Sequence, residues 1–343
     1  MNLGFDPFFG QIDELNALLE SADLIVVIGA KLSHNGTSGF GLRLSRDRLV
    51  HVDASAEVIG ANYPASLGIT SDAGDALIPI RNANLSASDW TAVELEKWQR
   101  RIRVADHTRE PRVGGTPAGD AESFFESLRR ALPADAIVVL DSGTHQILAR
   151  RYYKVLAPGG LIFPSDFQSM GFAIPTAIGA RIGAPDRVVV AIVGDGGFAM
   201  TGLELLSAVR EGLSIVVIVF VDGALGQIRV QQLADYGASH AVKLRNPDFG
   251  LFAAAVGAHY ELVGESIEVA VQGAIRRGGV VVLEVPVGDT FATVRMAAVS
   301  RAKAATRRVV GEKILSSVKR VLIGGKRAFA SSFQRRPAKS LKL

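Results

Sequence analysis

The sequence predicts an α/β protein whose main part is a doubly wound parallel sheet, preceded by a smaller and partial α/β unit. Runs of β-branched apolar residues, such as 187–193 and 214–221, alternate with segments of helical periodicity. Between these two runs, apolar residues recur at helical spacing from Phe198 to Glu211, and Gly212 follows as a stop signal. A strand, a helix and another strand in this order are typical of a parallel sheet.

The smaller unit is predicted over residues 1–85. A short helix is expected at 12–19, and apolar runs predict strands at 22–30 and 48–53. Asp72 is expected to open another short helix, 72–77. The unit is Rossmann-like but too short to be complete, and no G-x-G-x-x-G sequence follows a strand, which argues against a nicotinamide dinucleotide site.

Residues 86–117 are predicted to form a helix, near 90–104, and an exposed linker, because four prolines and glycines between 109 and 117 break regular structure. The main domain is predicted over 118–299, and a basic tail over 300–343. The strands of the main domain are expected at 136–140, 188–193, 215–221 and 280–285, and its helices at 122–132, 171–181, 198–211 and 267–276.

The composition is that of a globular protein, since 48% of the 343 residues are hydrophobic and 21% are charged. The absence of cysteine excludes disulfides and thiolate metal sites and is compatible with the cytoplasmic location that we expect. No apolar run reaches the ~20 residues that a membrane span needs. The first residues lack the basic start and apolar core of a signal peptide, so none is expected.

The positive net charge comes from the tail. Residues 300–343 hold 13 Lys and Arg but one acidic residue, so the rest of the chain carries a net charge of −8. The tail is interpreted as a solvated extension, with contact to nucleic acid or to an anionic membrane surface as open alternatives.

Two short turns predict a ligand site. Gly194-Asp195-Gly196-Gly197 follows one apolar run, and Asp222-Gly223-Ala224 follows the next, with 27 positions between the two aspartates. Because parallel strands end at the same edge of a sheet, we expect the two carboxylates to lie there together. Two carboxylates, a Gly-rich turn and a helix N-terminus suit a divalent cation that holds a phosphorylated ligand. Alternatively, an aspartate before glycine is only a turn or cap residue.

These turns and their surroundings resemble the thiamine diphosphate-dependent enzymes, in the branch of acetolactate synthase, benzoylformate decarboxylase and pyruvate decarboxylase. The resemblance includes the Gly-Asp-Gly turn with its second acidic turn, and it extends over roughly residues 20–290. Further matching segments are Asp141 to His145, Gln168 to Pro175 and Glu204 to Leu213. The resemblance implies the thiamine diphosphate-binding fold for the main domain.

The resemblance also implies roles for individual residues. Asp195, Asp222 and the backbone carbonyl of Ala224 match the ligands of a Mg²⁺ ion that bridges the cofactor's diphosphate. The residues that match cofactor contacts are Gly143, Thr144, His145, Met170, Gly194, Gly196, Gly197 and Gln227. Glycine permits close approach of backbone N–H groups to the diphosphate. Met170 matches the apolar residue that bends the cofactor, and Gln227 matches a position at the substrate pocket. As alternatives, Met170 is a core residue and His145 an ordinary loop histidine.

The implied function is decarboxylation of a 2-keto acid or carboligation, as in acetolactate synthase. Relatives usually carry asparagine where this chain has Val221, so we expect metal binding with altered local hydrogen bonding. Relatives also have a pyrimidine-binding domain that supplies an activating glutamate, and no such domain is found in this sequence. The resemblance implies a homo-oligomer, or a hetero-oligomer in which a partner chain provides that domain. We expect a homo-oligomer of this chain alone not to turn over, because the activating glutamate would be missing.

Two other interpretations remain open. The chain is alternatively a non-catalytic cofactor-binding or regulatory paralogue, or a truncated fragment. Some acetolactate synthases hold FAD through their middle domain, and a partial domain is a poor site for it.

Overall fold

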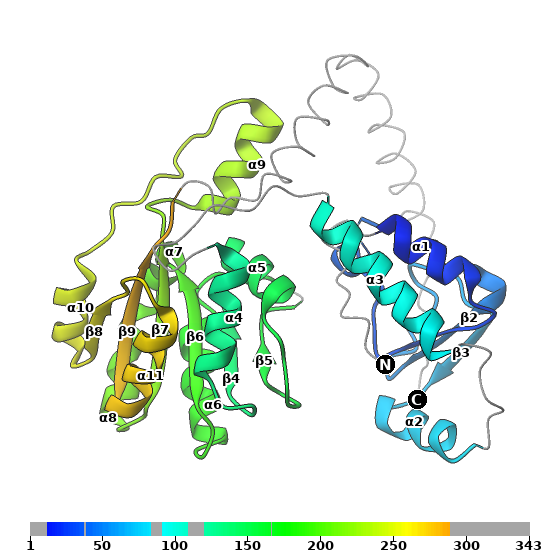
Figure 1. The fold of residues 1–343 in the computed structure, drawn as a ribbon, viewed down its shortest axis with the longest axis horizontal. Helices are drawn as coiled ribbons and strands as arrows, with labels where there is room; N and C mark the ends of the chain where they lie inside the picture. The colour runs from blue at the N-terminus through cyan, green and yellow to red at the C-terminus, as the bar shows by residue number, and fades with distance from the viewer. Residues whose placement is uncertain (1–11, 38, 84–90, 109–119, 166, 289–343) are drawn as a thin grey trace, which may run out of the picture. The chain divides into compact units, whose positions relative to one another are not determined.

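The structure, a computed structural model, describes residues 12–37, 39–83, 91–108, 120–165 and 167–288. The chain divides into two compact units, Met1–Pro111 and Arg112–Leu343 (Figure 1). The predicted linker at 109–117 and the basic tail lie outside the described residues. The domain limits drawn from the sequence stay predictions.

The first unit contains a three-stranded parallel sheet in the order β1-β2-β3. Its strands are β1 (Ile25–Ile28), β2 (Leu49–Asp53) and β3 (Leu67–Thr70), and its helices are α1 (Ile12–Ser21), α2 (Ala73–Asn82) and α3 (Ala92–Thr108). Asp72 caps α2 as predicted, because its side chain accepts a hydrogen bond from the Gly74 N–H. Strand β3 was not predicted, since all four of its residues are exposed and its apolar pattern is short.

The second unit contains a six-stranded sheet in the order β5-β4-β6-β7-β9-β8, in which every pair is parallel. The strands are β4 (Ile137–Leu140), β5 (Leu161–Ile162), β6 (Val189–Gly194), β7 (Ile215–Val221), β8 (His259–Leu262) and β9 (Val280–Pro286). The helices are α4 (Ala121–Ala131), α5 (Thr144–Tyr152), α6 (Ala173–Gly183), α7 (Asp195–Thr201), α8 (Leu205–Arg210), α9 (Gly226–Tyr236), α10 (Phe249–Val256) and α11 (Ile267–Arg277). The predicted doubly wound parallel sheet is confirmed.

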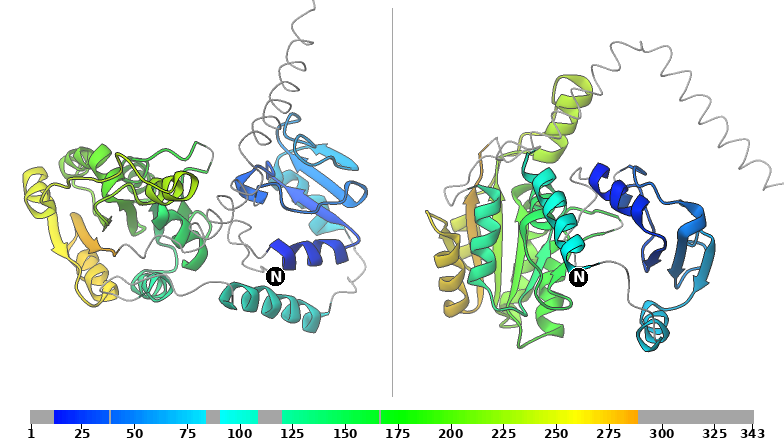
Figure 2. Two further views of the ribbon diagram at one scale, coloured as in Figure 1. Left: turned by 90° about the horizontal axis from the view of Figure 1, so that it is seen from above. Right: turned by 45° about the vertical axis from the view of Figure 1, so that its right-hand side comes forward.

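Helices cover both faces of this sheet (Figures 1 and 2). Alternate residues of β4, β6, β7 and β9 enter two separate apolar clusters, as Val138 and Leu140 do on one face and Ile137 and Val139 on the other. The first cluster includes residues of α4, α5 and α11, and the second includes residues of α6, α7, α8 and α10. Burial on both faces explains why these strands are continuous apolar runs in the sequence.

The predicted helix from Phe198 to Glu211 is wrong in its limits. The helical segment begins at Asp195, and a 3₁₀ turn at Gly202–Glu204 separates α7 from α8. Leu203 and Leu206 are 66% and 50% exposed, so the apolar pattern does not mark one continuous buried face. The earlier start makes Asp195 the first residue of α7, directly after β6.

Several elements of the second unit were not predicted from the sequence. Strand β5 has two residues, and β8 lies at the sheet edge with most of its residues exposed. Helices α5 and α9 begin without a side-chain cap hydrogen bond, so the usual start signal is absent. Among the described residues, none of the helices combines the length and the apolar character that crossing a membrane requires.

Phe124 offers a test of the core of the second unit. Its ring is fully buried and lies 5.3 Å from the ring of Phe125 and 5.1 Å from that of Phe220, between centroids. We expect Phe124→Ala to lower the free energy of unfolding by about 3–5 kcal/mol, because the substitution leaves a cavity. Chemical denaturation measures the change. Leu251→Ala is the control, because Leu251 is 72% exposed and should change stability by no more than about 0.5 kcal/mol. Equal effects of the two substitutions would contradict the packing described here.

Candidate functional site

The order of the strands places a ligand site at the carboxyl ends of β4 and β6. From β4 the chain crosses to β5 on one side, and it then returns to β6 on the other side of β4. At such a switch point the connections leave in opposite directions and open a crevice. Asp141 follows β4 and Asp195 follows β6, so the two carboxylates flank this crevice.

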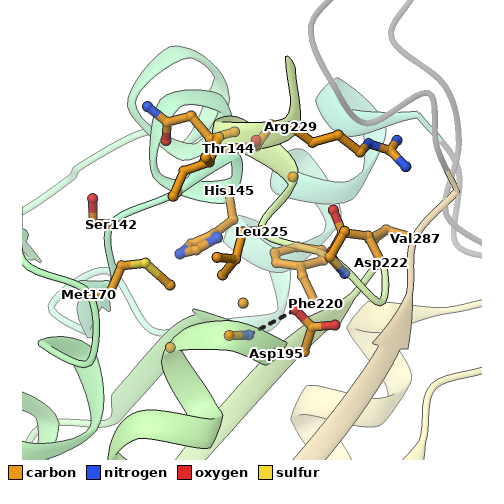
Figure 3. A pocket seen from close by; sticks show the side chains of 18 of the residues that line it. Ser142, Thr144, His145, Met170, Asp195, Phe220, Asp222, Leu225, Arg229 and Val287 are labelled. Carbon is orange, nitrogen blue, oxygen red and sulfur yellow. Dashed lines mark hydrogen bonds between the residues drawn. The ribbon is translucent and has the colours of Figure 1, made fainter. Parts of the chain in front are cut away.

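A cavity of about 320 Å³ opens at this edge (Figure 3). All eleven residues that the sequence assigned to metal or cofactor contacts line it: Gly143, Thr144, His145, Met170, Gly194, Asp195, Gly196, Gly197, Asp222, Ala224 and Gln227. Residues not predicted from the sequence also line it, including Phe220, Leu225 and Arg229. The structure thus brings the predicted residues together, and their roles as ligands stay predictions.

Asp195 is the most deeply buried acidic residue of the cavity lining, with 2% of its surface exposed. Its Oδ1 accepts a hydrogen bond of 2.8 Å from the Gly196 N–H. Its Oδ2 accepts two, from the Gly223 N–H at 2.8 Å and from Nδ2 of Asn246 at 2.7 Å. A buried carboxylate needs such donors to offset its lost hydration.

Asp222 lies in the turn after β7 and is only partly buried. Its Oδ1 accepts a hydrogen bond of 3.0 Å from the Ala224 N–H. Burial raises the pKa of Asp222, and the negative charge of Asp195 raises it further, whereas the Ala224 N–H and the charge of Arg229 act in the opposite direction. The effect of Asp195 indicates that the two carboxylates are close enough to interact. A cation bound between them would relieve this repulsion.

Asp141 joins three segments at the crevice, although it does not line the cavity. Its Oδ1 accepts hydrogen bonds from the N–H groups of Ser142 and Gly171, and its Oδ2 accepts one from Ala173. Burial raises the pKa of this carboxyl, and these backbone donors lower it. The contacts fix the start of α6 against the end of β4. Met170, which immediately precedes this segment, is thereby held at the cavity.

His145 lies in the first turn of α5 and is 6% exposed. Its ring stacks on that of Phe220, with 6.2 Å between the centroids and 26° between the ring planes. Nε2 is buried and has no hydrogen-bond partner within the described residues. Burial lowers the pKa of His145 to about 4, against a weaker opposing effect of a hydrogen bond that the ring donates to the backbone carbonyl of Asp141. His145 is therefore neutral near pH 7 and can donate or accept one hydrogen bond in the cavity.

Gly196 is packed closely against apolar side chains, so a larger residue would not fit there without displacing them. A Cβ atom at this position would lie 2.8 Å from Cδ2 of Leu225 and 3.1 Å from Cε of Met170. Gly197 is confined from the other side, because its Cβ would lie 2.9 Å from Cγ2 of Val193 and 3.0 Å from Oδ1 of Asp141. The Gly-rich start of α7 is thus packed so closely that backbone, rather than side chains, borders the cavity.

Comparison with known proteins assigns this architecture to a family. Residues 141–285 match the family model described as "Thiamine pyrophosphate enzyme, C-terminal TPP binding domain". Residues 2–80 match the model "Thiamine pyrophosphate enzyme, central domain". The chain therefore belongs to the thiamine pyrophosphate (thiamine diphosphate) enzymes.

Several curated proteins are similar to this chain over most of its length. The chain is 30% identical over 258 residues to the acetolactate synthase large subunit of Corynebacterium glutamicum, covering 73% of this chain and 41% of the relative. It is 25% identical over 312 residues to sulfoacetaldehyde acetyltransferase of Alcaligenes xylosoxydans xylosoxydans, covering 80% and 52%. It is 30% identical over 244 residues to a probable 2-ketoarginine decarboxylase of Pseudomonas aeruginosa, covering 70% and 42%. The chain spans about half the length of these relatives.

The donor groups of the cavity fit a diphosphate held by a magnesium ion. Two carboxylates and a backbone carbonyl are hard oxygen donors, which Mg²⁺ prefers together with phosphate oxygens and water. Among the described residues there is no group of three or more His, Asp or Glu side chains that could hold a metal by itself. The buried Nε2 of His145, which has no hydrogen-bond partner within the described residues, accords with a polar ligand in the cavity.

Sequence reasoning missed three residues that shape the site. Asn246 hydrogen-bonds to Asp195 across 51 positions of sequence, and nothing in its local pattern indicates that contact. Asp141 was named as part of a matching segment without its role as a hydrogen-bond acceptor. Gly226 begins α9, and a Cβ there would collide with Oδ2 of Asp222. The sequence signal that could have indicated the role of Gly226 is a glycine at the start of a helix that has no capping side chain.

The pKa of His145 gives a pH-dependent test. Folding lowers this pKa from its usual 6.5 to about 4, so the neutral ring stabilises the fold fully above pH 6.5. That contribution, about 3 kcal/mol by linkage, is lost as the pH falls from 6.5 toward 4. NMR of labelled histidine rings should show His145 without titration between pH 5.5 and 8, with His145→Gln to assign its signal. A midpoint near 6.5 would contradict the burial described here.

Proposed function

We propose that the cavity binds thiamine diphosphate with Mg²⁺ and that the protein acts as a decarboxylase or carboligase of 2-keto acids. The observation that supports this most is the meeting of Asp195, Asp222 and Ala224 at the edge of the parallel sheet. The membership of the chain in the thiamine diphosphate enzymes supports the same conclusion.

In this proposal, Asp195, Asp222 and the Ala224 carbonyl hold the magnesium ion. The two carboxylates offset the charge of the cation, and the cation in turn offsets the charge of the diphosphate. Gly194, Gly196 and Gly197 allow the phosphates to approach the N-terminus of α7, where backbone N–H groups point outward. Val221 stands where relatives usually carry asparagine. In the proposal this difference does not prevent metal binding, because the three ligand positions, Asp195, Asp222 and Ala224, are still present.

The loop of Gly143, Thr144 and His145 contacts the diphosphate from the side of β4. His145 is neutral there, so it acts as a single hydrogen-bond donor or acceptor rather than as a positive charge. Met170 supports the cofactor from the apolar side of the cavity, held in place through Asp141. Gln227, in the first turn of α9, faces the substrate. The bound cofactor supplies the carbanion chemistry that breaks and forms bonds next to the keto group.

The substrate class in this proposal is a small 2-keto acid. Acetolactate synthases and a probable 2-ketoarginine decarboxylase are among the relatives, and they support this class. We also propose that the working enzyme is an oligomer in which a pyrimidine-binding domain, in another chain or chain segment, supplies the activating glutamate. The described lining of the cavity contains no glutamate, which motivates this part of the proposal.

The metal assignment is tested by Asp195→Asn. The substitution removes one negative charge and one metal ligand, so Mg²⁺-dependent binding of thiamine diphosphate should be lost. Titration calorimetry with thiamine diphosphate, in the presence and absence of Mg²⁺, measures the effect. Asp186→Asn is the matched control, because Asp186 is an exposed residue of the same unit and should leave the affinity unchanged. Unchanged affinity in Asp195→Asn would refute the role of this carboxylate.

The proposed dependence on a pyrimidine domain is tested by turnover. The purified protein should bind thiamine diphosphate with Mg²⁺ yet consume pyruvate only at a trace rate, because the described lining of the cavity contains no glutamate that could activate the cofactor. Addition of a separately produced pyrimidine domain should raise the rate. Rapid pyruvate consumption by the chain alone would overturn this dependence. Cofactor binding without turnover in either assay would favour a non-catalytic binding protein.

A further inference from the structure

A short segment of chain lies along the turn that carries Asp222. We call residues 242–246 the strap. The Leu225 N–H donates to the Val242 carbonyl at 2.8 Å, and the Leu244 N–H donates to the Gly223 carbonyl at 2.8 Å. Ala224 and Lys243 pair between these bonds as an isolated antiparallel bridge. The strap is thus fixed to the turn by its own backbone.

Asn246 ends the strap and contacts the carboxylate of Asp195. Its Nδ2 lies 2.7 Å from Oδ2 of Asp195, in a partly buried position. Asn246 is not among the residues that line the cavity, so it hydrogen-bonds to Asp195 without occupying ligand space. The strap therefore joins the turn after β7 to the carboxylate that follows β6.

The two oxygens of Asp195 differ in how many donors they already have. A carboxylate oxygen offers about two lone-pair positions. Oδ2 accepts from Gly223 N–H and from Asn246, so both of its positions are used. Oδ1 accepts only from the Gly196 N–H, so one position remains for a ligand. Without Asn246, Oδ2 would also have a free position.

We propose that Asn246 is a positioning residue that restricts Asp195 to binding the metal through Oδ1 alone, and that it thereby favours Mg²⁺ over Ca²⁺. This inference rests on the proposed function. Mg²⁺ requires a small octahedral shell, whereas Ca²⁺ accepts six to eight oxygens and often both oxygens of one carboxylate. A carboxylate whose second oxygen is occupied by two N–H donors suits the first ion and disfavours the second.

A purely structural role for Asn246 makes a different prediction. The strap is already attached by two backbone hydrogen bonds, so loss of the Asn246 side chain leaves these contacts in place. If Asn246 only tethered the strap, removal of its side chain would weaken the binding of Mg²⁺ and of Ca²⁺ by the same factor. If it restricts Asp195, the two affinities change unequally. The ratio of the two dissociation constants therefore separates the alternatives.

The experiment compares Asn246→Leu with the wild-type full chain. Thiamine diphosphate is kept in excess, and calorimetry gives the dissociation constants of Mg²⁺ and Ca²⁺. Groups that hydrogen-bond to a metal ligand typically change metal affinity by about 10–100-fold when removed. We expect Mg²⁺ to bind Asn246→Leu about 10-fold more weakly than the wild type. The affinity for Ca²⁺ should fall less or not at all, so the preference for Mg²⁺ over Ca²⁺ should decrease.

Gln232→Leu is the matched control. Its Oε1 accepts a hydrogen bond of 2.8 Å from the His240 N–H, so it tethers the chain just before the strap but donates nothing to Asp195. This variant should keep the wild-type ratio of Mg²⁺ to Ca²⁺ affinity. An unchanged ratio in Asn246→Leu, with wild-type binding intact, would overturn the inference alone. Absence of metal-dependent cofactor binding in the wild type would overturn the proposed function, and this inference with it.

A measurement on the wild type covers the case in which Asn246→Leu does not fold. A crystal structure of the protein with thiamine diphosphate and Mg²⁺ should show Oδ1 of Asp195 next to the metal and Oδ2 still accepting from Gly223 and Asn246. Coordination through Oδ2, or through both oxygens, would overturn the inference.

Discussion

The carboxylate of Asp195 is the group on which the candidate site depends. Asp195 is almost fully buried, so its charge must be compensated by hydrogen-bond donors. Those donors come from three separate segments: the start of α7, the turn after β7 and the strap. Each segment is positioned by the sheet or by backbone pairing rather than by a long side chain. The buried carboxylate is therefore stabilised by the local fold, and it in turn holds the three segments together.

Asp141, which follows the neighbouring strand β4, is also a buried carboxylate held by hydrogen-bond donors, but its role is different. Its oxygens are satisfied by Ser142, Gly171 and Ala173, and it lies outside the cavity lining. It thus holds the start of α6, whereas Asp195 lines the cavity. Two aspartates at equivalent strand ends therefore differ in role. Each carboxylate accepts three hydrogen bonds, so the number of donors does not separate the two. Their position relative to the cavity does, because Asp195 lines it and Asp141 does not.

Much of this arrangement could be predicted because it follows from local sequence. The apolar runs that became β4, β6, β7 and β9 are buried on both faces, and the two acidic turns follow β6 and β7 directly. What could not be predicted depends on contacts distant in sequence. Asn246 stands before a proline and an aspartate, in a pattern that reads as a turn. Its contact with Asp195 exists only because the strap pairs with the turn after β7.

In the proposed metal site, the same donors serve two purposes at Asp195. Donors that make burial of the charge tolerable without a metal also fix the orientation of the carboxylate. A carboxylate fixed in this way binds a cation at little further cost in side-chain freedom, since its rotamer is already selected. The number of donors then limits how many oxygens the cation can use. In the proposed site, tolerance of the buried charge and preference for a small cation both result from one set of hydrogen bonds.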